Sequence, residues 1–363
     1  MAEKKRPVAK RKATRVRLEQ LARNADCEAN VISAVLDIPA NFVAGVDVAD
    51  NSKGKSQFAA EGGVLFEKAI FRADANGTPK IAALLRSSGL VDGDSELELV
   101  DLRLDAKSAV ESSVRTLLGI MSGEQDTGKA YLFAGFRFND EEFAMNFNAE
   151  FEIDLLLLTY KTEMNHWELR VGEVKTYPNR HGLTDAHQLA TARAQAGLYS
   201  HLLPKFMGRV GAPAHSISDK VFLVLSSVRG RSPEIWPNED IKEQTERAKK
   251  AVELFQRQSD ALHSRTSDSQ AETTSTLSIR PDEHVKTAYK EECWTFCDMA
   301  EHCLRQLVTL DHPRILGAEV EQLLGERTIE QVQQLLASGN PLSEAEADLL
   351  IRLGDAEFES VVS

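Results

Sequence analysis

The spacing of apolar residues changes along the chain from a helical to a strand-like period. Up to about residue 121, apolar positions recur every three to four residues and predict helices over 18–36, from about residue 61, and over 106–121. Further on, short apolar runs predict strands over 131–137, 143–147, 151–160, 167–176 and 221–226. A helix over about 184–203 separates the last two strands. This order predicts an α/β fold with a mixed central sheet flanked by helices.

Composition divides the chain further into segments. Residues 1–17 carry eight basic side chains and little apolar content, which predicts a flexible arm, either a solvated tail or a nucleic-acid-binding arm. Residues 18–56 form an N-terminal helical segment, and residues 57–263 form the α/β core, which ends in a charged amphipathic helix over 239–263. The Ser/Thr-rich residues 264–280 predict a flexible linker. Beyond it we expect a cysteine-bearing segment, 281–310, and a small helical tail, 311–363.

Candidate chemistry lies in two neighbouring strands of the predicted core. Asp154 interrupts the apolar run FEIDLLLLTY, and the next strand, WELRVGEVKTY, carries Glu173 and Lys175 two positions apart and therefore on one face. An antiparallel pairing would bring Asp154 beside them. Buried carboxylates are costly unless a cation neutralises them, and oxygen ligands suit Mg²⁺ or Mn²⁺. Such ions can promote the hydrolysis of a phosphodiester bond, and Lys175 could orient the attacking water or stabilise the negative charge that develops. The alternative is a solvated face with an ordinary Glu-Lys pair.

The helix after these strands carries a polar stripe. Gln188, Gln195 and Tyr199 are seven and four residues apart, so they share one helical face. Amides can bond phosphates or bases, and a tyrosine ring can stack on an unpaired base, so the stripe is a candidate DNA-binding surface. The alternative is an ordinary polar helix face.

Taken in order, these motifs resemble the RecB-like branch of the PD-(D/E)XK nuclease superfamily. The motifs are Gly63-Val-Leu-Phe-Glu67, Asp154 at the end of an apolar strand, Gly172-Glu173-Val174-Lys175 and Gln195-x-x-x-Tyr199. The resemblance covers about residues 57–230 and implies a restriction-endonuclease-like core. It implies that Glu67, Asp154, Glu173 and the Val174 carbonyl bind the metal, and that Asp154, Glu173 and Lys175 are catalytic. The chain departs from the family pattern at three positions, with Ile153 where proline is usual, Phe151 where glycine is frequent, and Glu67 where histidine is commoner.

All four cysteines fit one layout. Cys293, Cys297 and Cys303 form C-x3-C-x5-C, and Cys27 lies far upstream, before the core. Four thiolates favour an iron–sulfur cluster or a tetrahedral structural Zn²⁺. One cysteine before the core and three after it resemble iron–sulfur nucleases such as AddB and the CRISPR-adaptation exonuclease, which implies a 4Fe-4S cluster, although C-x2-C is usual there. Buried free thiols are the plainer alternative, and His302 could replace one ligand.

Charge and hydropathy restrict the partners and the compartment. The net charge of −13 means that any DNA contact must depend on local basic patches and bound cations. No apolar run approaches the length of a membrane span, and the basic N-terminus has no apolar segment behind it. We therefore expect no membrane partner and a cytoplasmic location, where thiols stay reduced and tend to bind metals.

One further motif is a false match. The segment from Gly123 to Lys129 resembles a phosphate-binding loop, but Ala130 stands where Ser or Thr is required, and the segment leads from a helix into a strand. We do not predict an ATPase in this chain.

Together these patterns predict a divalent-metal-dependent deoxyribonuclease. An exonuclease is favoured over an endonuclease, acting on single-stranded DNA or DNA ends in repair, recombination or antiviral defence, with a separate helicase or defence-complex partner. The main alternative is a catalytically inactive DNA-end-binding protein that retains the fold. A zinc-stabilised interaction protein would leave Asp154, Glu173 and Lys175 unexplained.

Overall fold

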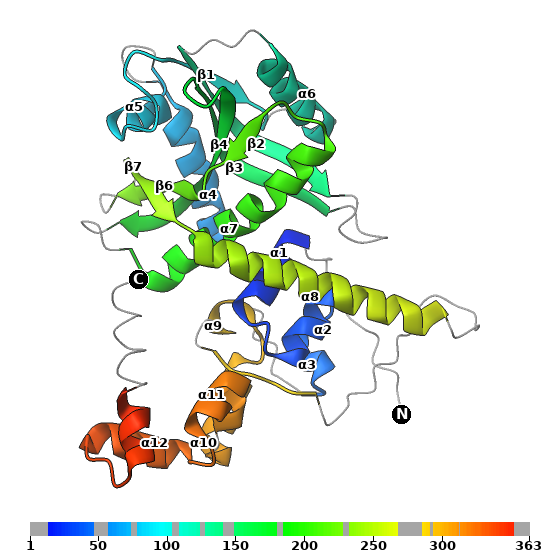
Figure 1. The fold of residues 1–363 in the computed structure, drawn as a ribbon, viewed down its shortest axis with the longest axis vertical. Coiled ribbons are helices and arrows are strands. Elements are labelled where there is room, and N and C mark those ends of the chain that lie inside the picture. The colour runs from blue at the N-terminus through cyan, green and yellow to red at the C-terminus, as the bar shows by residue number, and fades with distance from the viewer. Residues whose placement is uncertain are drawn as a thin grey trace. The chain divides into compact units, whose positions relative to one another are not determined.

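The computed structural model describes residues 14–46, 57–73, 78–103, 109–123, 128–140, 149–179, 184–227, 232–267, 285–290, 293–311 and 313–351. The chain forms two compact units (Figure 1). The sheet unit comprises Lys12–Ala22 and Gly54–His263, and the cysteine unit comprises Met1–Arg11, Arg23–Lys53 and Ser264–Ser363. The sheet unit thus spans the predicted core and also takes in a segment from before it.

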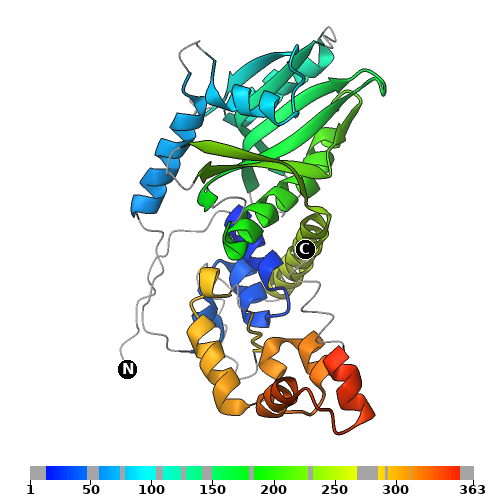
Figure 2. The same ribbon diagram turned by 90° about the vertical axis from the view of Figure 1, so that its left-hand side faces the viewer.

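A mixed seven-stranded sheet is the centre of the sheet unit, so the predicted α/β class is confirmed (Figures 1 and 2). Its order is β1-β2-β3-β4-β6-β7, with β5 also pairing with β4. Strands β2, β3 and β4 form an antiparallel meander, β1 is parallel to β2, β6 is parallel to β4, and β7 is antiparallel to β6. The strands are β1 Glu96–Asp101, β2 Lys129–Asp140, β3 Ala149–Lys161, β4 His166–Asn179, β5 His215–Ile217, β6 Lys220–Ser227 and β7 Pro233–Asp240.

The central strands are buried on both faces, which explains their continuous apolar runs. Leu155 and Leu157 of β3 pack in one cluster with Phe66 and Ile70, and the alternate residues Leu156 and Leu158 point to the other face and are equally buried. Helices α4 and α5 cover the first face, and α6 and α7 cover the second. The helices of this unit are α1 Thr14–Arg23, whose last residue belongs to the cysteine unit, α4 Gln57–Phe71, α5 Lys80–Ser87, α6 Ala109–Ser122, α7 Ala186–Arg209 and α8 Lys242–Ser267, which continues past His263.

The cysteine unit is helical in its described part. One apolar cluster surrounds Cys293, Cys297 and Cys303, and another joins Leu324 and Val332 in the tail. The elements are α2 Glu28–Leu36, α3 Ala40–Val43, α9 Cys293–Phe296, α10 Ala300–Leu310, the 3-10 helix η1 Pro313–Leu316, α11 Ala318–Leu324 and α12 Ile329–Ser338, and residues 344–351 are also helical. No helix in the described ranges is both long and apolar enough to cross a bilayer.

Several predicted boundaries were wrong. The helix expected over 18–36 is two helices, because Asn24 uses its side-chain amide to bind Ala288 O at 2.8 Å and Cys27 is extended, with φ −88° and ψ 106°. Part of the expected flexible arm is helical, since α1 begins at Thr14. The expected linker begins too early, since α8 continues to Ser267.

Other elements were missed or lie outside the described residues. Helix α5 and the edge strands β1 and β7 were not predicted, and β7 occupies residues 239 and 240, which we had placed in the following helix. The expected strand over 143–147, residues 1–13 of the arm and residues 268–280 of the linker lie outside the described residues. The loop after Gly123 does connect a helix to a strand, as expected, because α6 ends at Ser122 and β2 begins at Lys129.

Candidate functional site

Strands β3 and β4 bring the three core site residues together. Their paired register ends at Leu155↔Gly172, so Asp154 and Glu173 are the next residues on each strand and lie across from each other. The Asp154 Oδ2 atom accepts a hydrogen bond from the Val174 backbone N–H at 3.0 Å. The antiparallel geometry expected from the sequence therefore places both carboxylates at one point of the sheet.

Two irregularities in neighbouring strands surround this point. Gly135 of β2 lies where the register would meet Asp154, and its φ of +70° is one that side-chain-bearing residues rarely adopt. A Cβ there would also lie 2.6 Å from Cγ of Arg103. The pairing of β4 with β6 shifts between Lys175 and Pro178, directly after the site. Such bulges redirect side chains and are common beside active sites.

Glu173 is the most buried charged group of the site. Its side chain is 0% exposed, and its Oε2 atom has no hydrogen-bond partner among the described residues. Burial, followed by the negative charge of Asp154, raises the pKa of Glu173 well above its usual 4.5. An unpaired buried carboxylate oxygen is costly, and a bound cation would offset that cost.

Lys175 is the direct partner of Glu173. Its ammonium group donates to Glu173 Oε1 and to Gln195 Oε1, the latter at 3.0 Å. Burial by itself would lower the pKa of Lys175, but the charges of Glu173 and Asp154 raise it above its usual value. Lys175 therefore stays protonated at physiological pH and can act as a donor and a positive charge, not as a base.

Glu67 approaches the site from α4. Burial, and then the charge of Asp154, raises the pKa of Glu67, while Arg103 opposes the rise. Arg103 itself lies over the Phe71 ring at 3.9 Å and pairs with Asp101 at 2.6 Å. The charge of Asp154 raises the pKa of both glutamates, so these three carboxylates, the acidic group, interact electrostatically.

The donor atoms of these carboxylates suit a divalent cation, but their present arrangement suits it less well. Among the described residues, no three His, Cys, Asp or Glu side chains are arranged so that they could hold a metal ion as they stand. The donor set is nevertheless appropriate, since Glu67, Asp154 and Glu173 supply oxygen and one buried oxygen is unpaired. The Val174 N–H points to Asp154, and the carbonyl of the same strand residue points to the same side.

Helix α7 changes the interpretation of the polar stripe. Tyr199 is 0% exposed and Gln195 is 4% exposed, so the prediction that Tyr199 stacks on a base is wrong for this structure: its ring is enclosed. Gln195 Nε2 instead donates to the Tyr199 hydroxyl oxygen at 3.2 Å. Gln188 is half-buried in the first turn of α7, where its N–H is capped by Asp185 at 3.0 Å, and it remains a candidate DNA contact.

Sequence reasoning missed one residue of this network. Arg15, expected in the flexible arm, donates from Nη1 to the Tyr199 hydroxyl oxygen at 3.1 Å. The only available signal was the helical spacing of Leu18 and Leu21, both fully buried in α1.

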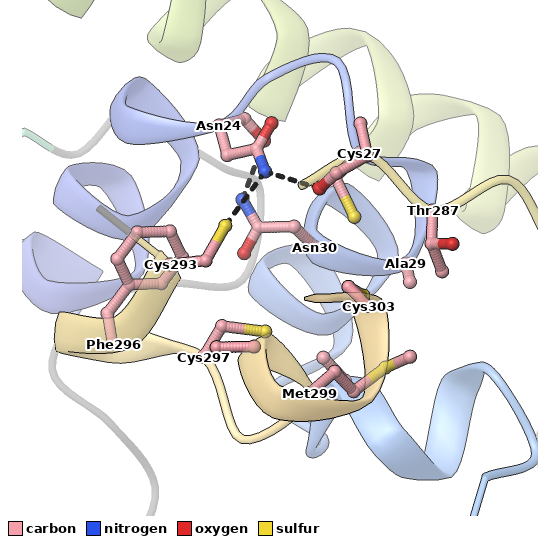
Figure 3. Close-up of a pocket in the computed structure, with 13 residues that line it drawn as sticks. Asn24, Cys27, Ala29, Asn30, Thr287, Cys293, Phe296, Cys297, Met299 and Cys303 are labelled. Atoms are coloured by element: carbon pink, nitrogen blue, oxygen red, sulfur yellow. Dashed lines mark hydrogen bonds between the residues drawn. The ribbon is translucent and has the colours of Figure 1, made fainter. Parts of the chain in front are cut away.

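The four cysteines of the cysteine unit line one pocket (Figure 3). Cys27 lies directly before α2, Cys293 and Cys297 lie at the start of α9 and after it, and Cys303 lies in α10. All four are buried thiols without disulfide bonds. His302 does not line this pocket, so nothing in the geometry favours it as a ligand.

The pocket also supplies hydrogen-bond donors to sulfur. Asn24 Nδ2 donates to Cys293 Sγ at 3.2 Å (Figure 3). The Lys290 backbone N–H donates to the same sulfur at 3.4 Å. Burial raises the pKa of Cys297 and of Cys303 to about 12, and it also raises the pKa of Cys27. Buried thiolates are thus unfavourable without a compensating cation, and N–H···S bonds are typical around metal thiolates.

As with the carboxylates, the thiols are not positioned as a finished metal site in the described part of the chain. The donor set fits four-thiolate coordination all the same, because every cysteine of the chain meets in one pocket. Comparison with family models found no family that matches this chain, and comparison with curated proteins found no match.

Proposed function

We propose that this protein is a divalent-metal-dependent deoxyribonuclease with a restriction-endonuclease-like core of the RecB-like PD-(D/E)XK type. One observation carries the proposal: Asp154 and Glu173 meet across adjacent strands beside Lys175, and a buried oxygen of Glu173 has no hydrogen-bond partner among the described residues. A solvated Glu-Lys pair, the plain alternative, would be exposed, whereas Glu173 is fully enclosed. A core that encloses an acidic group where the pairing of β3 with β4 ends is suited to holding a cation.

The proposed roles follow from the contacts. Glu67, Asp154, Glu173 and the Val174 carbonyl would hold Mg²⁺ or Mn²⁺, which lowers the pKa of water and offsets negative charge on a phosphodiester. Lys175, protonated and anchored by Gln195, donates to the attacking water or to a phosphate oxygen. Asp154 is held by the Val174 N–H, so its free oxygen keeps a fixed direction.

The topology is compatible with this assignment. The candidate site lies in the central strands of a mixed sheet, with α4 carrying Glu67 before the meander and α7 carrying Gln195 as the crossover from β4 towards β6. The motifs therefore follow one another along the chain in the same order as the elements that carry them to the site.

We propose a structural metal for the cysteine unit, a 4Fe-4S cluster with Zn²⁺ as the alternative. It would join Cys27 to the three downstream cysteines and so close a very long loop. The substrate we propose is single-stranded DNA or DNA ends, in repair, recombination or antiviral defence. A separate helicase or defence-complex partner would open duplex DNA for the enzyme.

The test is cleavage of labelled DNA by protein purified without oxygen. Linear single-stranded, linear double-stranded and circular single-stranded DNA would be incubated with Mn²⁺, Mg²⁺ or EDTA. We expect the wild type to cut with metal and Glu173→Gln not to cut. Glu168→Gln serves as the matched control, because Glu168 lies on the same strand and pairs with Lys161 at 3.3 Å, away from the site.

The substrates separate the alternatives. Cutting of linear but not circular strands indicates an exonuclease, and cutting of both indicates an endonuclease. If neither wild type nor Glu173→Gln cuts any strand while both bind DNA equally, the proposed activity is wrong and the DNA-end-binding function replaces it.

A further inference from the structure

Helix α1 belongs to the sheet unit and is not a free arm. Leu18 and Leu21 are fully buried, and Arg17 is 3% exposed, with its guanidinium 5.3 Å from the centre of the Phe255 ring. The unit boundary assigns Lys12–Ala22 to the sheet unit. The basic residues at this end of α1 therefore have fixed positions within the fold.

A chain of hydrogen bonds runs from α1 to the candidate catalytic lysine. Arg15 Nη1 donates to the Tyr199 hydroxyl oxygen at 3.1 Å, and Gln195 Nε2 donates to the same oxygen at 3.2 Å. Gln195 Oε1 then accepts from Lys175 Nζ at 3.0 Å. Four side chains from three separate segments are thus linked in series.

The residues at the two ends of this series of hydrogen bonds determine which atom donates in each bond. Arginine and protonated lysine can only donate, so the Tyr199 oxygen must accept from Arg15, and the Gln195 oxygen must accept from Lys175. With the amide turned over, its NH₂ group would face the Lys175 ammonium. Because Gln195 is buried, its side-chain oxygen and its side-chain nitrogen each need a hydrogen-bond partner. Only this orientation of the amide gives a partner to both atoms.

Arg15 is itself held in place. Its Nε atom lies 3.2 Å from Glu19 Oε1, one turn further along α1, while Nη1 reaches Tyr199. Tyr199 stays a neutral phenol, because burial raises its pKa far above the usual value.

From this geometry we propose that Arg15 is a positioning residue for the active site, acting through Tyr199 and Gln195 to hold the amino group of Lys175. The inference rests on the proposed nuclease function. Among the described residues, Arg15 contacts Tyr199 and Glu19 and none of the carboxylates of the acidic group. Loss of Arg15 should therefore slow the chemical step and leave the binding of DNA and metal largely unchanged.

The experiment compares the single-turnover cleavage rate, the KM for DNA and the Mn²⁺ affinity of four variants with those of the wild type. The variants are Arg15→Met, Arg15→Lys, Tyr199→Phe and the double variant Arg15→Met with Tyr199→Phe. We expect Arg15→Met and Tyr199→Phe each to reduce the rate roughly 10- to 100-fold, as the loss of one charge-assisted hydrogen bond implies, with KM and Mn²⁺ affinity within about threefold. Arg15→Lys should recover part of the rate.

The double variant tests the connection. If Arg15 acts through Tyr199, the double variant is no slower than the slower single variant, whereas independent effects would multiply. Arg17→Met is the matched control, because it removes a guanidinium from the same helix that lies over the Phe255 ring. We expect Arg17→Met to lower the melting temperature and to keep the cleavage rate.

The outcomes distinguish the two proposals. A wild type that cuts no DNA refutes the nuclease function and this inference with it. If the wild type cuts and Tyr199→Phe or Arg15→Met cuts equally fast, only the role of Arg15 is refuted. Equal losses in Arg15→Met and Arg17→Met would also refute it, since docking of α1 would then explain both. Should Arg15→Met fail to fold, Tyr199→Phe, which keeps the buried ring, decides the question.

Discussion

If the buried carboxylate at position 173 binds the proposed cation, the stability of the protein should depend on that metal. The substitution Glu173→Gln keeps the shape of the side chain and an oxygen that can accept from Lys175, but it removes the charge that a cation would bind. Glu173 is 0% exposed, and no residue in the described part of the chain bonds its Oε2 atom, so the loss of charge cannot be compensated by solvent.

The size of the effect follows from binding linkage. A ligand present at 100 times its Kd stabilises a folded protein by about 2.7 kcal/mol, which for a folding unit the size of the sheet unit corresponds to a rise of roughly 5–11 °C in melting temperature. If Glu173→Gln weakens Mn²⁺ binding about 100-fold, the same Mn²⁺ concentration contributes only RT ln 2, or about 0.4 kcal/mol. The expected rise in the variant is then roughly 1–2 °C.

The assay is thermal unfolding in EDTA and at increasing concentrations of Mn²⁺. The quantity compared is the melting temperature of the transition that Mn²⁺ shifts. Glu168→Gln, on the same strand and paired with Arg170 at 3.6 Å, should keep the full wild-type response to Mn²⁺. An equal Mn²⁺-induced rise in wild type and Glu173→Gln would refute the reasoning, because the buried carboxylate would then not be a ligand.

Three further predictions follow from the same contacts. Lys175→Met should abolish cleavage and lower the free energy of unfolding in EDTA by roughly 3–5 kcal/mol at neutral pH, measured with urea, because Glu173 and Gln195 lose their partner; unchanged stability would contradict this. Burial raises the pKa of Glu173, so the folded state binds the Glu173 proton more tightly than the unfolded state does. In EDTA, the free energy of unfolding of the wild type relative to that of Glu173→Gln should therefore decline as the pH rises above about 4.5, and an increase in this difference would contradict the prediction. Cys297→Ser should reduce bound iron or zinc, any visible absorption and the melting temperature, and full metal content would show that Cys297 is not a ligand.

The central part of the candidate site was predictable because it depends on short-range geometry. The two-residue spacing of Glu173 and Lys175 puts them on one strand face, and an antiparallel neighbour joined by a short turn must return Asp154 to the same place. The continuous apolar runs also identified strands buried on both faces. Both inferences need only the pleat of a strand and a turn.

The edge strands were not predictable in the same way. Strand β7, PEIWPNED, contains two prolines and three acidic residues, and β1, ELELVD, is no more than half-buried along its length. Neither has the apolar run of a central strand, and prolines are normally a sign against a strand. Each is a strand because a neighbour, β6 or β2, offers it hydrogen bonds. The tertiary fold determines which strand lies next to each edge strand, and the local sequence does not indicate it.

Tyr199 and Arg15 were misjudged for a related reason. A polar helix face and a run of basic residues both predict exposure, since isolated polar and charged groups are costly to bury. That cost disappears when the groups are partners of one another, as Arg15, Tyr199, Gln195 and Lys175 are. Whether a polar residue is solvated or belongs to a buried network thus depends on segments far apart in sequence. Removing residues 1–17 as a dispensable basic arm would delete Arg15, so a truncated chain that keeps this network should begin no later than Thr14, the first residue of α1.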